Sequence, residues 1–299
     1  MLIMFVLASF SSSALAERRR SRSVHTIGIL GYLGTDVETF QQKVEEFRKV
    51  LGASGAMATR VPGMEDMMRL LNSFRNSKYE FKFFDSLTSM ILALDSDKVK
   101  EISVPEHTAR YLMRNDPDYI ILFTVRMPSS ISFGFRNDDK ALCDEFNKAI
   151  KAMHEDGTLK ALAEKYIENP KGTPEAVEFE KFDGAGTIKV AVTGDMPPID
   201  YVAEDGSPAG YNTAVLSEIG KRLNKNIEVL SIEAGARTSS LVSGRADVIF
   251  WYRSTKGIDI SGVLEAKDNP LNSVMNDASE GVLLSEPYYE WQRNMILTF

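Results

Sequence analysis

The stretch most informative about the fold reads Gly194-Asp195-Met196-Pro197-Pro198-Ile199-Asp200-Tyr201. A predicted strand, Thr187–Val192, runs into its Pro-Pro corner, and a Gly-containing turn then leads into a predicted helix over residues 213–223. The two prolines stiffen the loop and hold the groups beyond the strand end in place. Because open α/β sheets bind ligands beyond the carboxyl ends of their strands, this corner predicts one wall of a pocket.

The composition is that of an ordinary globular protein. The chain has 299 residues, of which 43% are hydrophobic and 26% are charged. A net charge of −7 argues against a nucleic-acid partner. A single cysteine, Cys143, excludes an internal disulfide, and its helical surroundings favour a buried free thiol over a nucleophile.

The N-terminal residues differ from the rest of the chain. Residues 2–16 are apolar and small, they end in Ala14-Leu15-Ala16, and a run of charges follows at residues 17–20. This pattern predicts a signal peptide over residues 1–16, too short to span a membrane. No other long apolar run follows, so we expect a soluble protein that does not span the membrane and is exported to the periplasm or the extracellular space.

Strands and helices alternate through the first half of the chain, which predicts a mainly parallel sheet. A capping box opens a helix from residue 35 to 51, either as an anion-binding helix N-terminus or as a capped surface helix. A loop or short helix is expected at residues 51–63. Strands are expected at residues 27–30, 79–84, 102–104, 119–125 and 131–135, and helices at residues 86–94 and 108–113.

After residue 135 the alternation of strands and helices gives way to two helices and a linker, and it begins again at residue 187. An amphipathic helix at residues 138–153 and a second at 159–166 precede a linker over residues 169–186. The long polar segment 256–280 has no clear period. Beyond the linker, strands are expected at residues 187–192, 227–232, 247–251 and 295–299, and helices at 213–223 and 238–242.

Two blocks of sequence resemble the bacterial periplasmic solute-binding proteins of amino-acid uptake systems, solute-binding family 3. The first block covers residues 187–223, Ser243-Gly244-Arg245-Ala246-Asp247-Val248 and Leu284-Ser285-Glu286-Pro287-Tyr288-Tyr289, and is similar to the family's first lobe. The second, residues 133–167 with Asp156-Gly157-Thr158-Leu159, is similar to its closing segment. The resemblance implies an α/β, two-lobed periplasmic-binding-protein type II fold.

The order of these blocks is exchanged relative to the family. We expect a circularly permuted chain, because a truncated lobe would leave a sheet face exposed; the rival is two tandem, truncated modules. The permuted arrangement places lobe two at residues 24–134, closing helices that pack on lobe one at 135–168, a linker at 169–186 and lobe one at 187–299.

The resemblance also implies a ligand held between the lobes by aromatic side chains, an Arg and backbone N–H groups. The candidate ligand-binding residues are Asp195, Pro198, Tyr201, Arg237, Trp251, Arg253 and Ser254. Tyr201 would partly replace the family's aromatic residue, whose position Ile199 takes, and Arg253 or Arg237 would replace the family's arginine.

Each candidate also has a structural interpretation. Asp195 would cap a turn, Tyr201 would pack on the surface, and Trp251 would belong to the core. The arginines would be solvated and paired with nearby acids. In lobe two the family often uses an Asp to bind an amino group, whereas the matching segment here has Glu106, for which a surface role is expected.

Enzyme classes find little support in the sequence. His25, His107 and His154 share no metal-ligand spacing, and no phosphate-binding or nucleophile motif is present. We therefore expect no catalytic residue, metal or cofactor. The expected function is capture, by a monomer, of a small anionic or amino-acid-like ligand for an ABC permease. The alternatives are a ligand-sensing module of a signalling system and a lyase or dehydratase of the same fold.

Overall fold

The computed structural model describes residues 25–30, 79–84, 86–170, 176–203, 205–233, 236–254 and 282–299. Four predictions lie outside these residues. They are the signal peptide over residues 1–16, the helix at 35–51, the loop at 51–63 and the polar segment at 256–280.

Among the described residues, one mixed sheet runs through the molecule in the order β2-β1-β3-β12-β4-β10-β5-β9, with β11 beside β4. The prediction of a mainly parallel sheet is wrong for its centre, where β4 and β12 pair antiparallel with their neighbours. The reason is that the chain crosses between the two ends of the sheet along β4 and returns along β12. The strands of this sheet are β1 (His25–Leu30), β2 (Tyr79–Phe84), β3 (Glu101–Pro105), β4 (Ile120–Arg136), β5 (Thr187–Val192), β9 (Asn226–Ser231), β10 (Val248–Ser254), β11 (Val282–Leu284) and β12 (Tyr289–Thr298).

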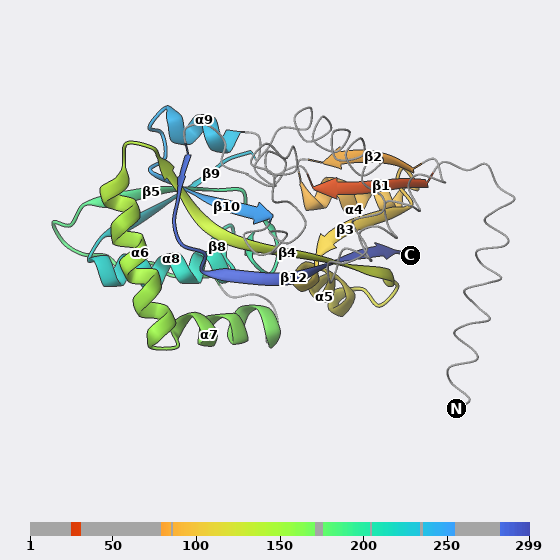
Figure 1. Ribbon diagram of the computed structural model, residues 1–299, viewed down its shortest axis with the longest axis horizontal. Helices are drawn as coiled ribbons and strands as arrows, with labels where there is room; N and C mark the ends of the chain where they lie inside the picture. Colours follow the sequence, from red (N-terminus) through yellow and green to blue (C-terminus); the bar gives the residue numbers. More distant parts are fainter. Residues whose placement is uncertain are drawn as a thin grey trace, which may run out of the picture.

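The elements separate into two lobes, which Figure 1 shows side by side with β4 and β12 running between them. Lobe two holds β1, β2 and β3 with α4 and α5, and lobe one holds β5, β9, β10 and β11 with the remaining helices. The helices are α4 (Leu87–Asp95), α5 (Glu106–Asn115), α6 (Lys140–Glu155), α7 (Thr158–Ala163), the π-helix η2 (Glu164–Glu168), α8 (Tyr211–Leu223) and α9 (Arg237–Val242).

Strand β4 replaces two shorter predicted strands. The apolar runs at residues 119–125 and 131–135 predicted a break between them, whereas β4 continues for 17 residues. Strand β12 pairs with β4 from Tyr289 to Thr298. The register of this pairing shifts between Trp291 and Arg293, where the ladder of β12 and β4 is irregular. Since β12 begins at Tyr289, it is also longer than the strand predicted at residues 295–299.

Helices α6 and α7 pack on α8 of lobe one. Cys143 on α6 is a buried free thiol, as predicted, and burial raises its pKa. The segment from residue 176 to 186 also follows lobe one. Val177 N donates a hydrogen bond to Pro208 O at 3.0 Å, and Phe182 N donates to Asn226 Oδ1 at 2.9 Å.

A cluster of aromatic side chains anchors the crossing strands. Phe133 of β4 is fully buried and stacks on Tyr288, with ring centroids 4.5 Å apart. The Tyr288 hydroxyl donates to Asn212 Oδ1 of α8 at 2.9 Å. From lobe two, His107 packs edge-on against Trp291 of β12, with ring centroids 5.1 Å apart. The crossing strands are therefore held by ring contacts on both sides, which contribute beyond their buried area.

Candidate functional site

A small three-stranded sheet carries the Pro-Pro corner. It consists of β6 (Asp195–Met196), β7 (Asp200–Val202) and β8 (Pro208–Ala209), and its turn contains the cis Pro197-Pro198 peptide bond. Gly210 has a φ of 98°, and a Cβ there would lie 2.6 Å from Ile199 O. The backbone of the corner is thus packed directly against the start of α8.

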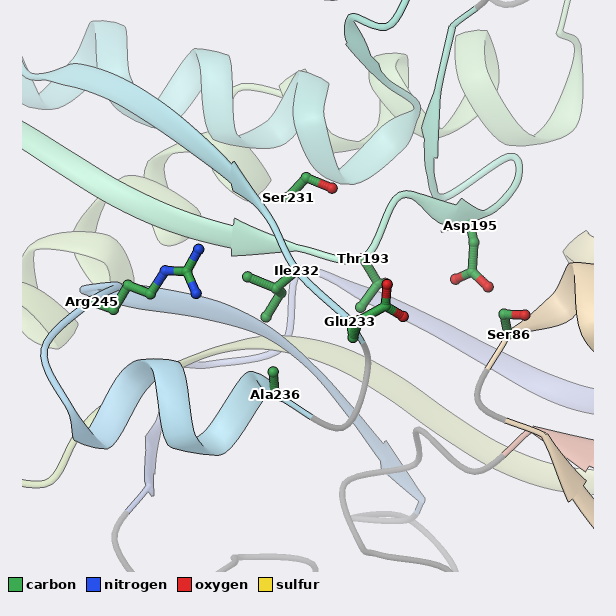
Figure 2. A pocket seen from close by; sticks show the side chains of 8 residues that line it. All are labelled: Ser86, Thr193, Asp195, Ser231, Ile232, Glu233, Ala236 and Arg245. Carbon is green, nitrogen blue, oxygen red and sulfur yellow. The ribbon is translucent and has the colours of Figure 1, made fainter.

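A cavity of about 400 Å³ lies at the carboxyl ends of β5 and β9. Thr193 and Asp195 follow β5, Ser231 ends β9, and Ile232, Glu233, Ala236 and Arg245 continue the lining of lobe one. Ser86, which precedes α4, comes from lobe two. Figure 2 shows these side chains, with Arg245 and Asp195 on opposite sides of the view. The cavity therefore lies where the two lobes meet.

Asp195 joins the two lobes. Its Oδ2 atom accepts a hydrogen bond from Leu87 N, the first residue of α4, at 2.9 Å. Its Oδ1 atom is buried and has no hydrogen-bond partner among the described residues. Burial raises the pKa of the Asp195 carboxyl above its usual value, while the Leu87 N–H and the Arg237 charge act in the opposite direction.

Behind Asp195, a second carboxylate and an arginine are buried in lobe one. Asp200 Oδ2 accepts hydrogen bonds from Thr193 Oγ1 and Gly194 N, each at 3.3 Å. Burial raises the pKa of Asp200 to about 6, although the Gly194 N–H and the Arg237 charge lower it. Arg237 is only 6% exposed at the start of α9, so its charge acts on the protein's own carboxylates Asp195 and Asp200.

Neither Tyr201 nor Pro198 is among the described residues that line the cavity, although Tyr201 of β7 pairs with Asp195 of β6. The Tyr201 ring is half-buried and tilted against Tyr111 of α5, with centroids 6.5 Å apart. Pro198 is buried, and its carbonyl accepts from Tyr211 N at 3.1 Å. Ile199 is fully buried in the core. Glu106 forms an ion pair with Arg110 one turn further along α5.

Trp251, Arg253 and Ser254 belong to β10, and their side chains lie outside the described part of the chain. The backbone still gives their place in the fold. Since β10 runs parallel to β5, its last residues lie at the same edge of the sheet as Thr193. The structure thus brings Asp195 to the cavity and buries Arg237 at the start of α9. It places the backbone of Trp251, Arg253 and Ser254 at the edge of the sheet where β5 and β9 also end.

Six polar residues at or near the site were missed from the sequence: Ser86, Thr193, Asp200, Ser231, Glu233 and Arg245. A signal existed for some of them. Thr193, Ser231 and Glu233 stand at or just after the ends of predicted strands, the positions that the strand-end rule selects. Ser86 and Arg245 had no such signal, because their places depend on contacts between distant parts of the chain.

The described residues show neither a metal-binding cluster nor a membrane span. No group of three or more His, Cys, Asp or Glu side chains among them has the arrangement to hold an ion. None of the helices in the described ranges has the length and apolar character needed to cross a bilayer.

Two lobes on one sheet, crossed by two strands and with a cavity where they meet, define the class of two-lobed binding proteins with the periplasmic-binding-protein type II fold. The profile of the family "Bacterial extracellular solute-binding proteins, family 3" matches residues 25–169 and 188–255, and the chain belongs to this family. No curated protein matches the chain.

Solved structures of binding proteins show distant similarity. They include the ligand-binding component of an ABC-type import system from Staphylococcus aureus, with zinc bound, at 9% identity and a TM-score of 0.41, covering 92% of this chain and 66% of that one. The periplasmic aliphatic sulphonate binding protein SsuA from Escherichia coli has 10% identity and a TM-score of 0.37, with 93% and 65% covered. The BvgS VFT2 domain from Bordetella pertussis has 10% identity and a TM-score of 0.37, with 92% and 80% covered. This chain therefore spans just under two thirds of the first two proteins.

Proposed function

We propose that this protein captures a small solute between its two lobes and delivers it to an ABC-type permease. The observation that carries the proposal is the cavity of about 400 Å³ at the carboxyl ends of β5 and β9, lined by lobe one and by Ser86 of lobe two. A cavity of this size, with a few convergent polar groups, suits a small polar ligand. Membership of the solute-binding family supports the same function.

Contacts across the cleft support closure by a hinge motion. Besides the hydrogen bond from Leu87 N to Asp195, Arg114 Nη2 of α5 donates to Glu168 O of η2 at 2.8 Å. These contacts join surfaces that separate when the lobes open, whereas β4 and β12 remain continuous. The proposed ligand is amino-acid-like or a small carboxylate, and the proposed form is a monomer.

Export completes the proposed role. The apolar residues 2–16 would direct the chain to the periplasm or the extracellular space, where a permease meets the loaded protein. Immunoblotting of cell fractions tests this step, with removal of residues 1–16 as the matched control. Equal amounts of both forms in the cytoplasm would contradict it.

We also propose that the lobes are encoded in exchanged order within one folding unit. The support is that residues from both halves share one sheet: β12 pairs with β3 and β4, and β10 pairs with β4. A fragment of residues 186–299 alone is therefore expected to lack cooperative unfolding. If this fragment unfolds cooperatively and binds solute, the arrangement is two tandem modules instead.

A thermal-shift screen of the full chain tests the binding function. The panel contains amino acids, dicarboxylates and polyamines, and a ligand present at 100 times its Kd stabilises the native state by about 2.7 kcal/mol. We expect an increase in Tm with at least one of these classes. No stabilisation by any small solute would count against the proposed function.

Arg253 remains the proposed carboxylate-binding residue of β10. A charged hydrogen bond from its guanidinium would make Arg253→Ala weaken binding of a carboxylate ligand by about 1.5–3 kcal/mol. Isothermal titration calorimetry with the best ligand of the screen measures this loss, and Lys189→Ala on β5 is the exposed cationic control. Unchanged affinity in Arg253→Ala would remove this residue from the site.

A further inference from the structure

Strand β12 passes from one lobe to the other at a bulge. Near its start, the ring of Tyr289 lies against that of Tyr211 on α8 of lobe one, with centroids 5.2 Å apart. Further along, residues 294–297 pair with β3 of lobe two. Between these parts, residues 127–128 of β4 stand opposite Gln292 alone, and the second of them is a proline, which donates no hydrogen bond to the ladder. A hinge motion of the lobes would therefore bend the crossing strands at this bulge.

A histidine of lobe two reaches across the bulge. His107 lies in the first turn of α5, which directly follows β3 and lies beside β12 (Figure 1). Its ring packs edge-on against Tyr289 and Trp291, with centroids 5.6 and 5.1 Å away. Both of these rings stand on the lobe-one side of the bulge. Bending of the strands at the bulge would therefore separate His107 from them.

The His107 imidazole is enclosed and lacks hydrogen bonds. The residue is 3% exposed, and neither ring nitrogen has a partner among the described residues. Burial, and to a smaller extent the charge of Arg110, lowers the pKa of His107 from 6.5 to about 3. The packed ring is therefore neutral, and a proton favours an arrangement that returns the ring to water.

The charges around His107 do not compensate a proton on the packed ring. On α5, Arg110 forms an ion pair with Glu106, and the Arg110 charge opposes protonation of His107. Burial, with Glu168 of η2 and Glu106, raises the pKa of the Tyr289 hydroxyl, which stays uncharged. The other ionisable groups of β3 and β12, the strands packed against α5, are Glu101, Glu290 and Arg293. None of these groups is hydrogen-bonded to the imidazole, so the described surroundings favour the neutral ring.

We propose that His107 makes closure of the lobes sensitive to acid: its neutral ring holds α5 against β12 across the bulge, and its protonation releases this contact and favours the open lobes. A solute in the cleft is then released as the surroundings become mildly acidic. This release rests on the proposed solute-binding function, whereas the opening itself needs no solute.

The direction follows from the two environments of the ring. The closed arrangement binds the proton more weakly than the open one, where a solvated imidazole has its ordinary pKa of about 6.5. The closed form keeps its full advantage above this pH and loses it as the pH falls toward 3. With a fully solvated ring in the open form, the ratio of open to closed molecules rises about tenfold from pH 7.5 to pH 5.5.

Fluorescence resonance energy transfer between dyes on the two lobes of the full chain measures this ratio. The dyes are attached at Leu92→Cys on α4 and Val242→Cys on α9, two exposed positions, while the native Cys143 is buried. We expect the tenfold rise in the labelled parent and its loss in His107→Phe, which keeps an aromatic ring but cannot titrate. His154→Gln on the exposed side of α6 is the control and should keep the response of the parent. The carboxyl groups of the cleft titrate in all of these proteins, so the difference between them isolates His107.

Histidine-ring NMR of the full chain adds a readout that requires no substitution at the contact. The chain has three histidines, so His25→Gln and His154→Gln assign the His107 signal by elimination. We expect the His107 ring to titrate at least about one pH unit below a solvated imidazole. If His107→Phe does not fold, this titration decides alone.

Two results would overturn the inference: the same pH response of the dye signal in the parent and in a folded His107→Phe, or a His107 ring that titrates as in water. A solute from the thermal-shift panel should also bind up to about tenfold more weakly at pH 5.5 than at pH 7.5, and this loss should disappear in His107→Phe. An acid-induced opening with no stabilising solute would preserve the role of His107 and reject only the solute-binding function.

Discussion

Two of the connections between the lobes differ in chemistry. The crossing joint, formed by β4 and β12 with the buried rings of Phe133, Tyr288 and Trp291, is covalently continuous and packed by aromatic side chains. The hairpin contact, where β6 and β7 touch α4 and α5, depends on one hydrogen bond to Asp195 and on the half-buried ring pair of Tyr201 and Tyr111. In the proposed hinge motion, opening of the cleft would therefore break the second connection and leave the first intact.

The largest effect is expected in the crossing joint. Phe133→Ala removes a side chain with no exposed surface, so the free energy of unfolding should fall by about 3–5 kcal/mol in urea denaturation. Leu92→Ala on α4, where the side chain is 60% exposed, is the control and should change it by less than about 0.5 kcal/mol. A small loss in Phe133→Ala would mean that the joint does not hold the lobes together.

The next effect concerns Asp200, buried in lobe one beneath the hairpin contact. Burial raises its pKa from 3.8 to about 6, so the folded state binds a proton more tightly than the unfolded state does. This contribution to stability is present at low pH and is lost as the pH rises between these values, by roughly 2–3 kcal/mol.

Urea denaturation of wild type and Asp200→Asn across pH 4 to 7 isolates this contribution. The wild type should lose stability relative to Asp200→Asn over the lower part of this range, and the difference should become constant above the folded pKa. A difference that does not vary with pH would contradict the raised pKa of Asp200.

The hairpin contact should give the smallest change in free energy. Asp195→Ala removes the acceptor of Leu87 N and should weaken closure of the lobes by about 1 kcal/mol, while Asp195→Asn keeps the acceptor. Spin labels at Leu92 and Val242, both exposed and on different lobes, report the change as a longer and broader distance distribution. Identical distributions in wild type and Asp195→Ala would show that this bond does not hold the lobes together.

The local pattern of apolar and polar residues was sufficient to predict much of the fold. Strand Thr187–Val192 has the predicted bounds, and α8 and α9 begin within two residues of the predicted starts. The local pattern of apolar and polar residues did not predict strands whose formation depends on pairing with a strand far away in sequence. The polar residues Glu290, Gln292 and Arg293 interrupt the apolar pattern over the first half of β12, so the sequence did not predict a strand there. This half of the strand forms because β4 provides a hydrogen-bonding partner for its backbone.

The site was less predictable than the fold for the same reason. The strand-end rule led to Asp195, which lines the cavity. Its partner Leu87 is 108 residues away in sequence, so the contact that joins the lobes has no local signal. Arg237 and Arg253 were chosen for their positive charge near strand ends. Among the described side chains, the guanidinium that lines the cavity belongs to Arg245, beyond α9, while Arg237 is buried. Arg253 stays a prediction, because its side chain lies outside the described part of the chain.

The most direct test of the account is a crystal structure of the full chain with the solute that stabilises it most in the thermal-shift screen. We expect the solute to lie between the lobes, in contact with Asp195 of lobe one and beside Ser86 of lobe two. A solute bound outside this cavity, with Asp195 and Ser86 untouched, would contradict the central claim.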